Sequence, residues 1–257
     1  MNNVMELLEN RMSLRKYKGK EISEEDLNLI LKGAMRAPTA GNMMLYSIIV
    51  VRDKETKEKL SKTCDNQRFI ANSSVILIFL ADLQRWFDFY KCSGVEEFCK
   101  DNNMKFETPD EGDLMLGIED AMIAAQNAAI AAESIGVGSC YIGDIVENYD
   151  VHRKILDFPD WAAPICMLCM GYYPDNYKRI ISNRFDKKYI VFNEHYKRLT
   201  DDELKDMFAD SQKKVVKENI YKAKNFGQLM YARKTGTEFS REMTRSIKEM
   251  MKKWCSH

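Results

Sequence analysis

Two arginines and a serine near the start of the chain occupy alternating positions that suit an anion. In the stretch RMSLRKY, Arg11, Ser13 and Arg15 are separated by Met12 and Leu14. Successive side chains of an extended segment point to opposite faces, so the two guanidinium groups and the hydroxyl would share one face. Guanidinium groups bind phosphate through charge-assisted, often bidentate hydrogen bonds. The spacing therefore predicts an anion site, although a solvated basic face fits the same triplet.

A second group of polar side chains lies in the loop RAPTAGN. Ser23, with Asp26 three residues later, predicts the start of a helix. Pro38 disfavours helical geometry in the residue before it, so this helix should end near Ala37. Thr39 and Asn42 then follow in the loop. Their hydroxyl and carboxamide could bind a heterocycle, and ordinary turn chemistry explains them equally well.

Familiar catalytic and metal-binding motifs are absent from the sequence. It contains no G-x-S-x-G, no Walker A motif and no H-E-x-x-H. Cys166 and Cys169 form a C-x-x-C within an apolar run that reads as a buried strand. An odd separation in a strand sends the two thiols to opposite faces, and the three histidines are far apart. We therefore expect core cysteines and no metal site.

Composition excludes several functional classes. The 257 residues carry 39 basic and 39 acidic side chains, and zero net charge argues against a nucleic-acid binder that relies on a positive field. The longest apolar runs, 75–81 and 163–171, are too short to cross a bilayer. The first residues include glutamate among the apolar ones and do not resemble a signal peptide. We expect a cytoplasmic protein that binds neither membrane nor nucleic acid.

Strand and helix patterns alternate along the chain, which indicates mixed α/β layers. The alanine-rich stretch 112–136 predicts the longest helix, and Gly136 should stop it. Its apolar side chains extend around much of the helix, so it belongs either in the core of one subunit or at a subunit contact. The other predicted elements are helices at 4–10, 54–63 and 147–157, strands at 46–52, 74–81 and 163–171, an exposed helical excursion after residue 82, and a charged helical tail from about residue 200.

Taken in order, these segments resemble the nitroreductase family of FMN-dependent flavoenzymes. The stretch RMSLRKY resembles the family's R-x-S-x-R-x-[YF] opening, and APTAGN resembles its A-P-[ST]-x-x-N loop. The longest similar stretch is GIEDAMIAAQNAAIAAESIGVGSCYIG, which resembles the family's central dimer helix and the turn beside flavin N5. NQRFIANSSVILIFLAD and MGYYPD with NRFDKKYIVFNEHY complete the order. The helical tail favours the branch of larger NADPH-dependent nitroreductases and flavin reductases.

The resemblance implies an α+β fold of mixed α/β layers. A central, mostly antiparallel sheet would be flanked by helices. Residues 1–195 would form the FMN-binding domain, and residues 196–257 a helical C-terminal extension packed on the same domain or on a partner subunit. The protein would be a homodimer with the flavin near the subunit boundary.

The resemblance also assigns roles to individual residues, without any catalytic side chain. The Gly143 N–H would face flavin N5. Met44 stands where the family often has glutamine, and Ser182 where it often has a basic residue, so Lys178 or Arg179 is the alternative source of the second phosphate charge. The implied FMN contacts are Arg11, Ser13, Arg15, Thr39, Asn42, Gln67, Tyr141, Ile142, Gly143 and Arg184, and the implied NADPH contacts are Arg233 and Lys234.

The activity implied by the resemblance is a ping-pong redox cycle. NADPH or NADH would reduce FMN, and a nitroaromatic, a quinone or a free flavin would then be reduced at the same face of the cofactor. Two alternatives remain open at this point. One is a flavin-binding sensor or carrier without turnover, and the other is a specialised flavoenzyme such as a reductive dehalogenase or a biosynthetic oxidase.

Overall fold

The computed structural model describes residues 3–216 and 218–256. Contacts between residues divide the chain into two compact units. The first contains Met1–Ile180 together with Glu242–His257, and the second is Ile181–Arg241. The assignment of cofactor binding to residues 1–195 stays a prediction.

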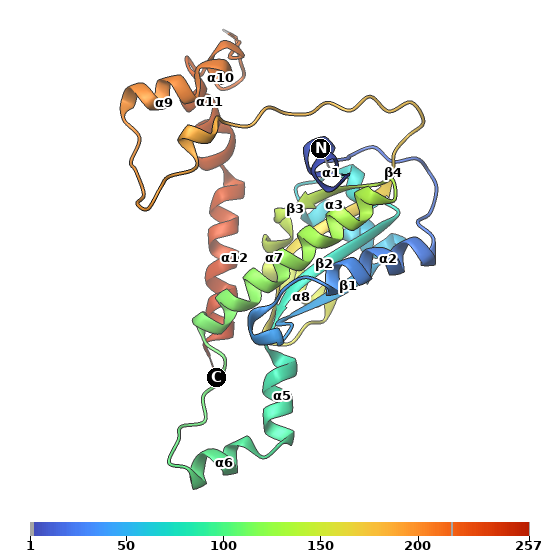
Figure 1. Cartoon of the computed structure of the whole chain (residues 1–257), viewed down its shortest axis with the longest axis vertical. Helices are drawn as coiled ribbons and strands as arrows, with labels where there is room; N and C mark the ends of the chain where they lie inside the picture. The colour runs from blue at the N-terminus through green and yellow to red at the C-terminus, as the bar shows by residue number, and fades with distance from the viewer. Residues whose placement is uncertain (1–2, 217, 257) are drawn as a thin grey trace. The chain divides into compact units, whose positions relative to one another are not determined.

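A four-stranded antiparallel sheet forms the centre of the first unit (Figure 1). The strands are β1 (Tyr46–Val51), β2 (Val75–Asp82), β3 (Val137–Ile142) and β4 (Ala162–Tyr172), in the order β1-β2-β4-β3. All eight residues of β2 are buried, as its continuous apolar run predicts for an inner strand. The order leaves β1 and β3 at the two edges, so the predicted α+β class with an antiparallel sheet is confirmed.

The two cysteines of the C-x-x-C pack on opposite faces of β4. Cys166 belongs to one buried apolar cluster, whereas Cys169 belongs to the cluster on the other side of the sheet. The prediction from strand periodicity is therefore confirmed. All seven cysteines of the chain are free.

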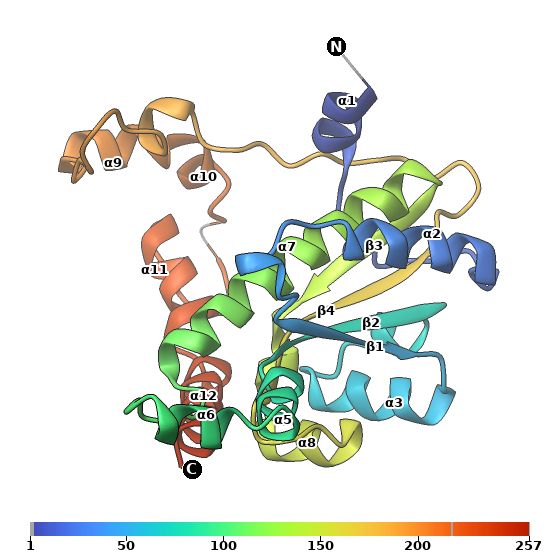
Figure 2. The ribbon, with the colours of Figure 1, turned by 60° about the horizontal axis from the view of Figure 1, so that its bottom comes forward.

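Helices cover both faces of the sheet (Figure 2). α2 (Glu24–Met35) and α7 (Glu111–Ser134) lie on one face, and α3 (Lys54–Thr63) and α8 (Tyr149–Leu156) lie on the other. The absence of a side chain at Gly33 allows α2 to approach α7 closely, because a Cβ added there would lie 2.6 Å from the Ala131 side chain. Within the described residues, no helix has the length and apolarity to span a membrane.

Helix ends follow the capping residues. The Ser23 hydroxyl accepts from the Asp26 N–H at the start of α2, as predicted. α7 begins with a capping box in which Asp110 and Asp113 bond each other's backbone N–H. The chain leaves α7 through Gly136, whose φ of 78° is accessible to glycine at little cost.

The N-terminal segment runs along the free edge of β3. After α1 (Asn3–Asn10), Ser13 forms a parallel bridge with Ser139, and the Leu14 N–H donates to the Ser139 carbonyl at 2.9 Å. Leu14 is fully buried against Gly138, where a Cβ would lie 2.5 Å from the leucine Cδ2. The segment is therefore extended, and the absence of a side chain at Gly138 lets it pack closely against the sheet.

The remaining elements of the first unit are short, apart from the last helix. The Trp254 indole N–H donates to the Asp110 carbonyl at 2.9 Å, which fastens the end of that helix to the start of α7. These elements are η1 (Ala40–Asn42), α4 (Arg68–Ala71), α5 (Gln84–Cys92), α6 (Val95–Asp101), η2 (Gly143–Val146) and α12 (Glu238–Trp254), whose first turn lies in the second unit.

The second unit is less continuously helical than the sequence predicts. Asn219 donates to the carbonyls of Val216 and Ala223 at 3.0 and 2.9 Å, and this local bonding competes with helix formation. Before α12, which ends at Trp254 as the predicted tail does, the unit contains short pieces: η3 (Lys187–Tyr189), α9 (Asp201–Met207), α10 (Ala209–Lys213), α11 (Phe226–Met230) and the π-helical turn η4 (Tyr231–Thr235).

Candidate cofactor-binding site

The predicted anion-binding side chains converge at the edge of β3. Burial raises the pKa of the Cys140 thiol, whereas Arg15, the Ser13 hydroxyl and Arg11 lower it. The three side chains therefore act on one point of β3. The Arg15 guanidinium also lies over the Phe69 ring, 5.7 Å from its centroid.

Three buried polar atoms in this region have no hydrogen-bond partner among the described residues. They are Nη1 of Arg11 and the hydroxyl oxygens of Tyr17 and Ser139. Buried polar groups in folded proteins are nearly always bonded, so each such atom requires an explanation. An anion beside Arg11 would supply the missing acceptor for the guanidinium.

The Gln67 carboxamide is held at a fixed orientation. Its Nε2 donates to the Cys64 carbonyl and to Asp144 Oδ1, both at 3.0 Å. These two acceptors use both amide protons, which leaves the side-chain oxygen Oε1 as the group that can accept from a ligand. Asp144 lies two residues after the end of β3, so this bond joins the loop before α4 to the turn after β3.

That turn presents Gly143 to solvent. Gly143 is exposed, and a Cβ added there would meet no atom within 4 Å. The neighbouring side chains point elsewhere: Ile142 is buried in the core, and the Tyr141 hydroxyl donates to Gln126 of α7 at 3.2 Å. Of the predicted Tyr141-Ile142-Gly143 segment, Gly143 offers the open backbone to a flat ring.

The buried side chain of His152 connects the turn after β3 to the end of α3. His152 of α8 is fully buried, with Nδ1 2.8 Å from the Ile145 carbonyl and Nε2 2.7 Å from the Thr63 hydroxyl. Because a carbonyl can only accept, Nδ1 carries the proton and Nε2 can accept from Thr63. Burial lowers the pKa of His152. The neutral ring thus bridges η2, which carries Gly143, and the end of α3 ahead of Gln67.

The predicted Thr39 and Asn42 loop is fixed to α7. The Asp120 carboxylate is 2% exposed and accepts from the backbone N–H groups of Ala40 and Leu45 at 2.9 and 3.0 Å. The Thr39 hydroxyl accepts from the Met44 N–H at 3.2 Å. Asn42 is exposed at the tip with a φ of 59°. The loop is rigidly supported and presents the Asn42 carboxamide to solvent.

One chain places the two groups of predicted contacts at opposite edges of the sheet. The loop leads into Tyr46 at the start of β1, whereas Arg11, Ser13 and Arg15 lie beside Ser139 of β3. The strand order separates them by roughly 14 Å across the sheet, and the pairing register by roughly 20 Å along it. Arg11, Ser13, Arg15, Gln67 and Gly143 form one cluster, and Thr39 and Asn42 form another.

The model of the nitroreductase family matches residues 8–172, which include both clusters and the whole sheet. The chain belongs to the nitroreductase family. Among curated relatives, the FMN reductase (NADPH) of Bacillus subtilis is 32% identical over 174 residues. That match covers 67% of this chain and 66% of the relative, slightly less than two thirds of its length.

Solved nitroreductase structures extend the likeness to the rest of the chain. NfrA1 nitroreductase from B. subtilis superposes with a TM-score of 0.78 and 26% identity, covering 97% of this chain and 98% of that one. NfrA2 of B. megaterium gives the same identity, TM-score and coverage. The nitroreductase fold therefore includes the C-terminal region as well as the sheet.

Three predicted contacts lie in the second compact unit. Arg184 is exposed in the extended stretch ahead of η3, and Arg233 and Lys234 are exposed in the π-helical turn η4. Their roles toward the flavin phosphate and NADPH stay predictions. All the other predicted FMN contacts lie in the first unit.

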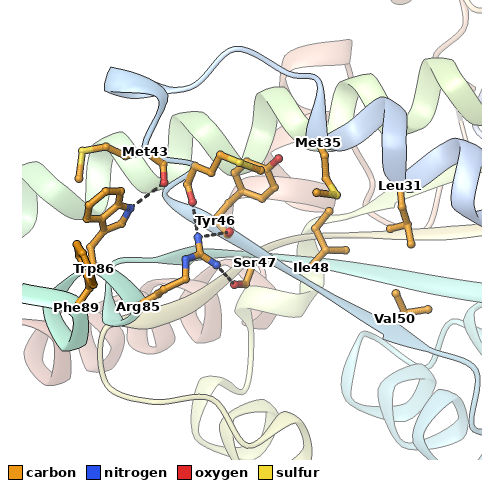
Figure 3. Close-up of a pocket in the computed structure, with 11 residues that line it drawn as sticks. Leu31, Met35, Met43, Tyr46, Ser47, Ile48, Val50, Arg85, Trp86 and Phe89 are labelled. Carbon is orange, nitrogen blue, oxygen red and sulfur yellow. Dashed lines mark hydrogen bonds between the residues drawn. The ribbon is translucent and has the colours of Figure 1, made fainter. Parts of the chain in front are cut away.

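A groove of about 570 Å³ lies along the free edge of β1 (Figure 3). Its walls are mainly apolar and include Met35, Ile48 and Phe89, which come from α2, β1 and α5. Arg85 donates from Nη2 to the carbonyls of Met44 and Tyr46, at 2.6 and 3.2 Å. These bonds cover the backbone at the start of the open strand edge.

Sequence reasoning missed the residues that support the site. Asp144 orients Gln67, Asp120 holds the Thr39 loop, and His152 bridges two segments. A signal existed for Asp120, because a carboxylate on the buried side of an alanine-rich helix requires hydrogen-bond donors. Asp144 and His152 are each far in sequence from their partners Gln67 and Thr63, so no local sequence pattern predicts these bonds.

Proposed function

We propose that this nitroreductase-family chain is an FMN-dependent oxidoreductase that uses NADPH or NADH to reduce small acceptors such as nitroaromatics, quinones or flavins. The observation that carries the proposal is the single cluster formed by Arg11, Ser13, Arg15, Gln67 and Gly143. It combines groups for a phosphate, a pyrimidine edge and a flat ring. The name of the relative, FMN reductase (NADPH), supports both cofactors.

The residues present fit the phosphate end of FMN. Arg11 has a buried donor atom without a partner, and Arg15 and Ser13 lie beside it. Two guanidinium groups and a hydroxyl match a dianionic phosphate in both charge and donor number. A buried guanidinium atom without an acceptor costs free energy unless such an anion is bound.

The residues also fit the ring of the flavin. Gln67 Oε1 would accept from the pyrimidine N–H, because both amide protons of Gln67 are already used. The exposed Gly143 would let the ring approach and would donate its N–H to flavin N5. Bound FMN would supply the electron-transfer chemistry, so no acid–base side chain is required. The protein's part is to orient the ring and to keep its N5 edge hydrogen-bonded.

A homodimer would complete the site. Thr39 and Asn42 lie at the far edge of the sheet from Arg15, so a flavin that touches both groups requires the loop of a second copy. Apolar side chains exposed on α7, among them Met115, Met122 and Ile123, support a subunit contact. An exposed apolar face of this kind is typical of a protein interface. In the dimer, Arg184 would close on the phosphate, and Arg233 and Lys234 would hold NADPH.

The purified protein tests the proposal directly. We expect a yellow protein whose absorbance near ~450 nm, a property of the bound flavin, bleaches anaerobically on addition of NADPH or NADH. Re-oxidation by a nitroaromatic, a quinone or free flavin would establish turnover. Bleaching by neither nucleotide would favour the sensor or carrier alternative, and a colourless protein that cannot be reconstituted with FMN would exclude every flavin-dependent role. The same acceptor screen, extended to halogenated substrates, would reveal a dehalogenase, and cell fractionation would test the predicted cytoplasmic location.

A further inference from the structure

Arg179 joins three parts of the first unit. Its Nη1 lies 2.6 Å from Oε1 of Glu133 on α7, and it donates to the Asn10 carbonyl at 2.9 Å. Its guanidinium also lies over the Tyr173 ring, 4.4 Å from the centroid. One side chain thus links α7, the segment after β4 and the residue that immediately precedes Arg11.

The carboxylate that Arg179 contacts is deeply buried. The Glu133 side chain is 1% exposed, and its two oxygens also accept from the Tyr173 hydroxyl at 3.2 and 2.9 Å. A buried carboxylate that loses its cation is strongly unfavourable, so a nearby positive charge will be drawn to it. In the structure Arg179 supplies this positive charge.

Arg11 acts electrostatically on the same tyrosine. Its charge lowers the pKa of Tyr173, which burial and Glu133 raise, and it also lowers that of Tyr141. Arg11 Nη1 is nevertheless buried and bonded to none of the described residues. Both arginines thus act on the hydroxyl that bonds Glu133, and among the described residues Arg179 is the cation paired with that carboxylate.

We propose that Arg179 is a positioning residue that keeps Arg11 available for the phosphate of FMN. By pairing with Glu133 it removes the acceptor that would otherwise attract Arg11. By bonding the Asn10 carbonyl it fixes the backbone from which Arg11 projects. The inference rests on the proposed function, because it takes FMN as the ligand of Arg11. Nη1 of Arg179 bonds Glu133 and the Asn10 carbonyl, so this nitrogen is not available to a phosphate.

The test compares two flavins that differ in the phosphate. Apoprotein is titrated with FMN and with riboflavin, and binding is followed by quenching of flavin fluorescence. We expect Arg179→Ala to weaken FMN binding about tenfold or more, with riboflavin affinity unchanged, because only FMN needs Arg11. Adding Glu133→Gln to Arg179→Ala removes the competing charge and should restore much of the FMN affinity. Lys16→Ala is the control, because it removes an exposed neighbouring charge.

Several outcomes would overturn the inference. Equal losses for FMN and riboflavin in Arg179→Ala would mean general loosening of the fold. Undiminished FMN affinity in Arg179→Ala would show that Arg11 does not depend on Arg179. No recovery in the double variant would show that Glu133 does not compete with the phosphate for Arg11. Circular dichroism and the conservative Arg179→Lys variant, which should retain part of the preference for FMN, guard against misfolding.

Failure of the proposed function would be recognised separately. A wild-type protein that binds riboflavin and FMN equally, or neither, would remove the phosphate site itself and with it the proposed role of Arg179. Amide hydrogen exchange without flavin would then show whether the Asn10 contact alone holds the segment. The Arg11 N–H, which donates to the Leu7 carbonyl at 2.9 Å, should exchange faster in Arg179→Ala if it does.

Discussion

The Gln67 amide donates to the Asp144 carboxylate at 3.0 Å, across 77 positions of the chain. Gln67→Glu replaces this donor with a second negative charge and should release the side chain. We expect FMN and riboflavin affinities to fall together by about tenfold, because the ring contact is shared by both flavins. Fluorescence titration measures this, with Asn66→Asp as a control that adds the same charge one residue away. A loss restricted to FMN would contradict the assignment of Gln67 to the ring.

Arg11 and Arg15 should contribute to the affinity for FMN but not to the affinity for riboflavin. Each charged hydrogen bond to phosphate contributes about 1.5–3 kcal/mol, so changing both residues to alanine should weaken FMN binding by more than tenfold. Equilibrium dialysis of the variant, with Lys16→Ala beside it, provides the measurement. FMN that stays bound through dialysis of the double variant would remove the phosphate assignment.

Gly138 should be required for the position of the N-terminal segment. A Cβ there would lie 2.5 Å from Leu14 Cδ2 and 2.9 Å from the Tyr173 ring, so Gly138→Ala forces the segment or the ring to move. Overpacking of this kind costs about 1–3 kcal/mol of unfolding free energy. Urea unfolding tests it against Gly19→Ala, since nothing lies within 4 Å of a Cβ at Gly19. Equal midpoints for the two variants would show that the contact yields easily.

Glu147 gives the protein a specific pH dependence. Burial, with the neighbouring charges of Asp144, Asp65 and Glu242, raises its pKa from 4.5 to about 7. The folded state thus holds this proton more tightly than the unfolded state. The resulting stability is complete below pH 4.5 and is lost as the pH rises through 7.

The corresponding variant is Glu147→Gln, which cannot ionise. We expect it to be more stable than the wild type by more than about 1 kcal/mol at pH 8, with little difference near pH 4.5. Urea unfolding at both pH values measures the contrast, and Glu9→Gln on exposed α1 serves as the control. A gain of the same size at both pH values would show that packing, rather than charge, is responsible.

The exposed face of α7 should be a subunit contact. Met122 and Ile123 are each 40% exposed, and replacing both with glutamate places charge on that apolar face. We expect light scattering to show a monomer, accompanied by loss of FMN, because the loop of the second copy would be missing. Val151→Glu is the control, because the Val151 side chain is 43% exposed and lies on α8 rather than α7. A wild-type monomer that holds FMN would contradict the proposed dimer.

Local patterns predicted most of the secondary structure because capping and periodicity act over a few residues. The charged helix predicted at 54–63 is α3, bounded by the Asp53 cap. The strand predicted at 163–171 begins one residue earlier and ends one later. The helical tail from about residue 200 was harder to predict from the sequence, because the turn closed by Asn219 interrupts a run of good helix formers.

The candidate site was predictable where family motifs are contiguous. Arg11, Ser13 and Arg15 lie together because one extended segment carries all three. The supporting bonds of Asp144, His152 and Glu133 were not predictable, since each depends on a pairing that only the fold creates. The separation of the Thr39 loop from Arg15 likewise follows from strand order, which no single motif encodes.

That separation has a consequence for genetics. One allele that lacks Arg11 and Arg15 and another that lacks Thr39 and Asn42 would each produce a dimer without a working site. A mixed dimer would carry one site with both defects and one with neither, since each site would draw on both chains. Random pairing would restore roughly a quarter of all sites. Two defective copies of this gene in one cell should therefore complement each other.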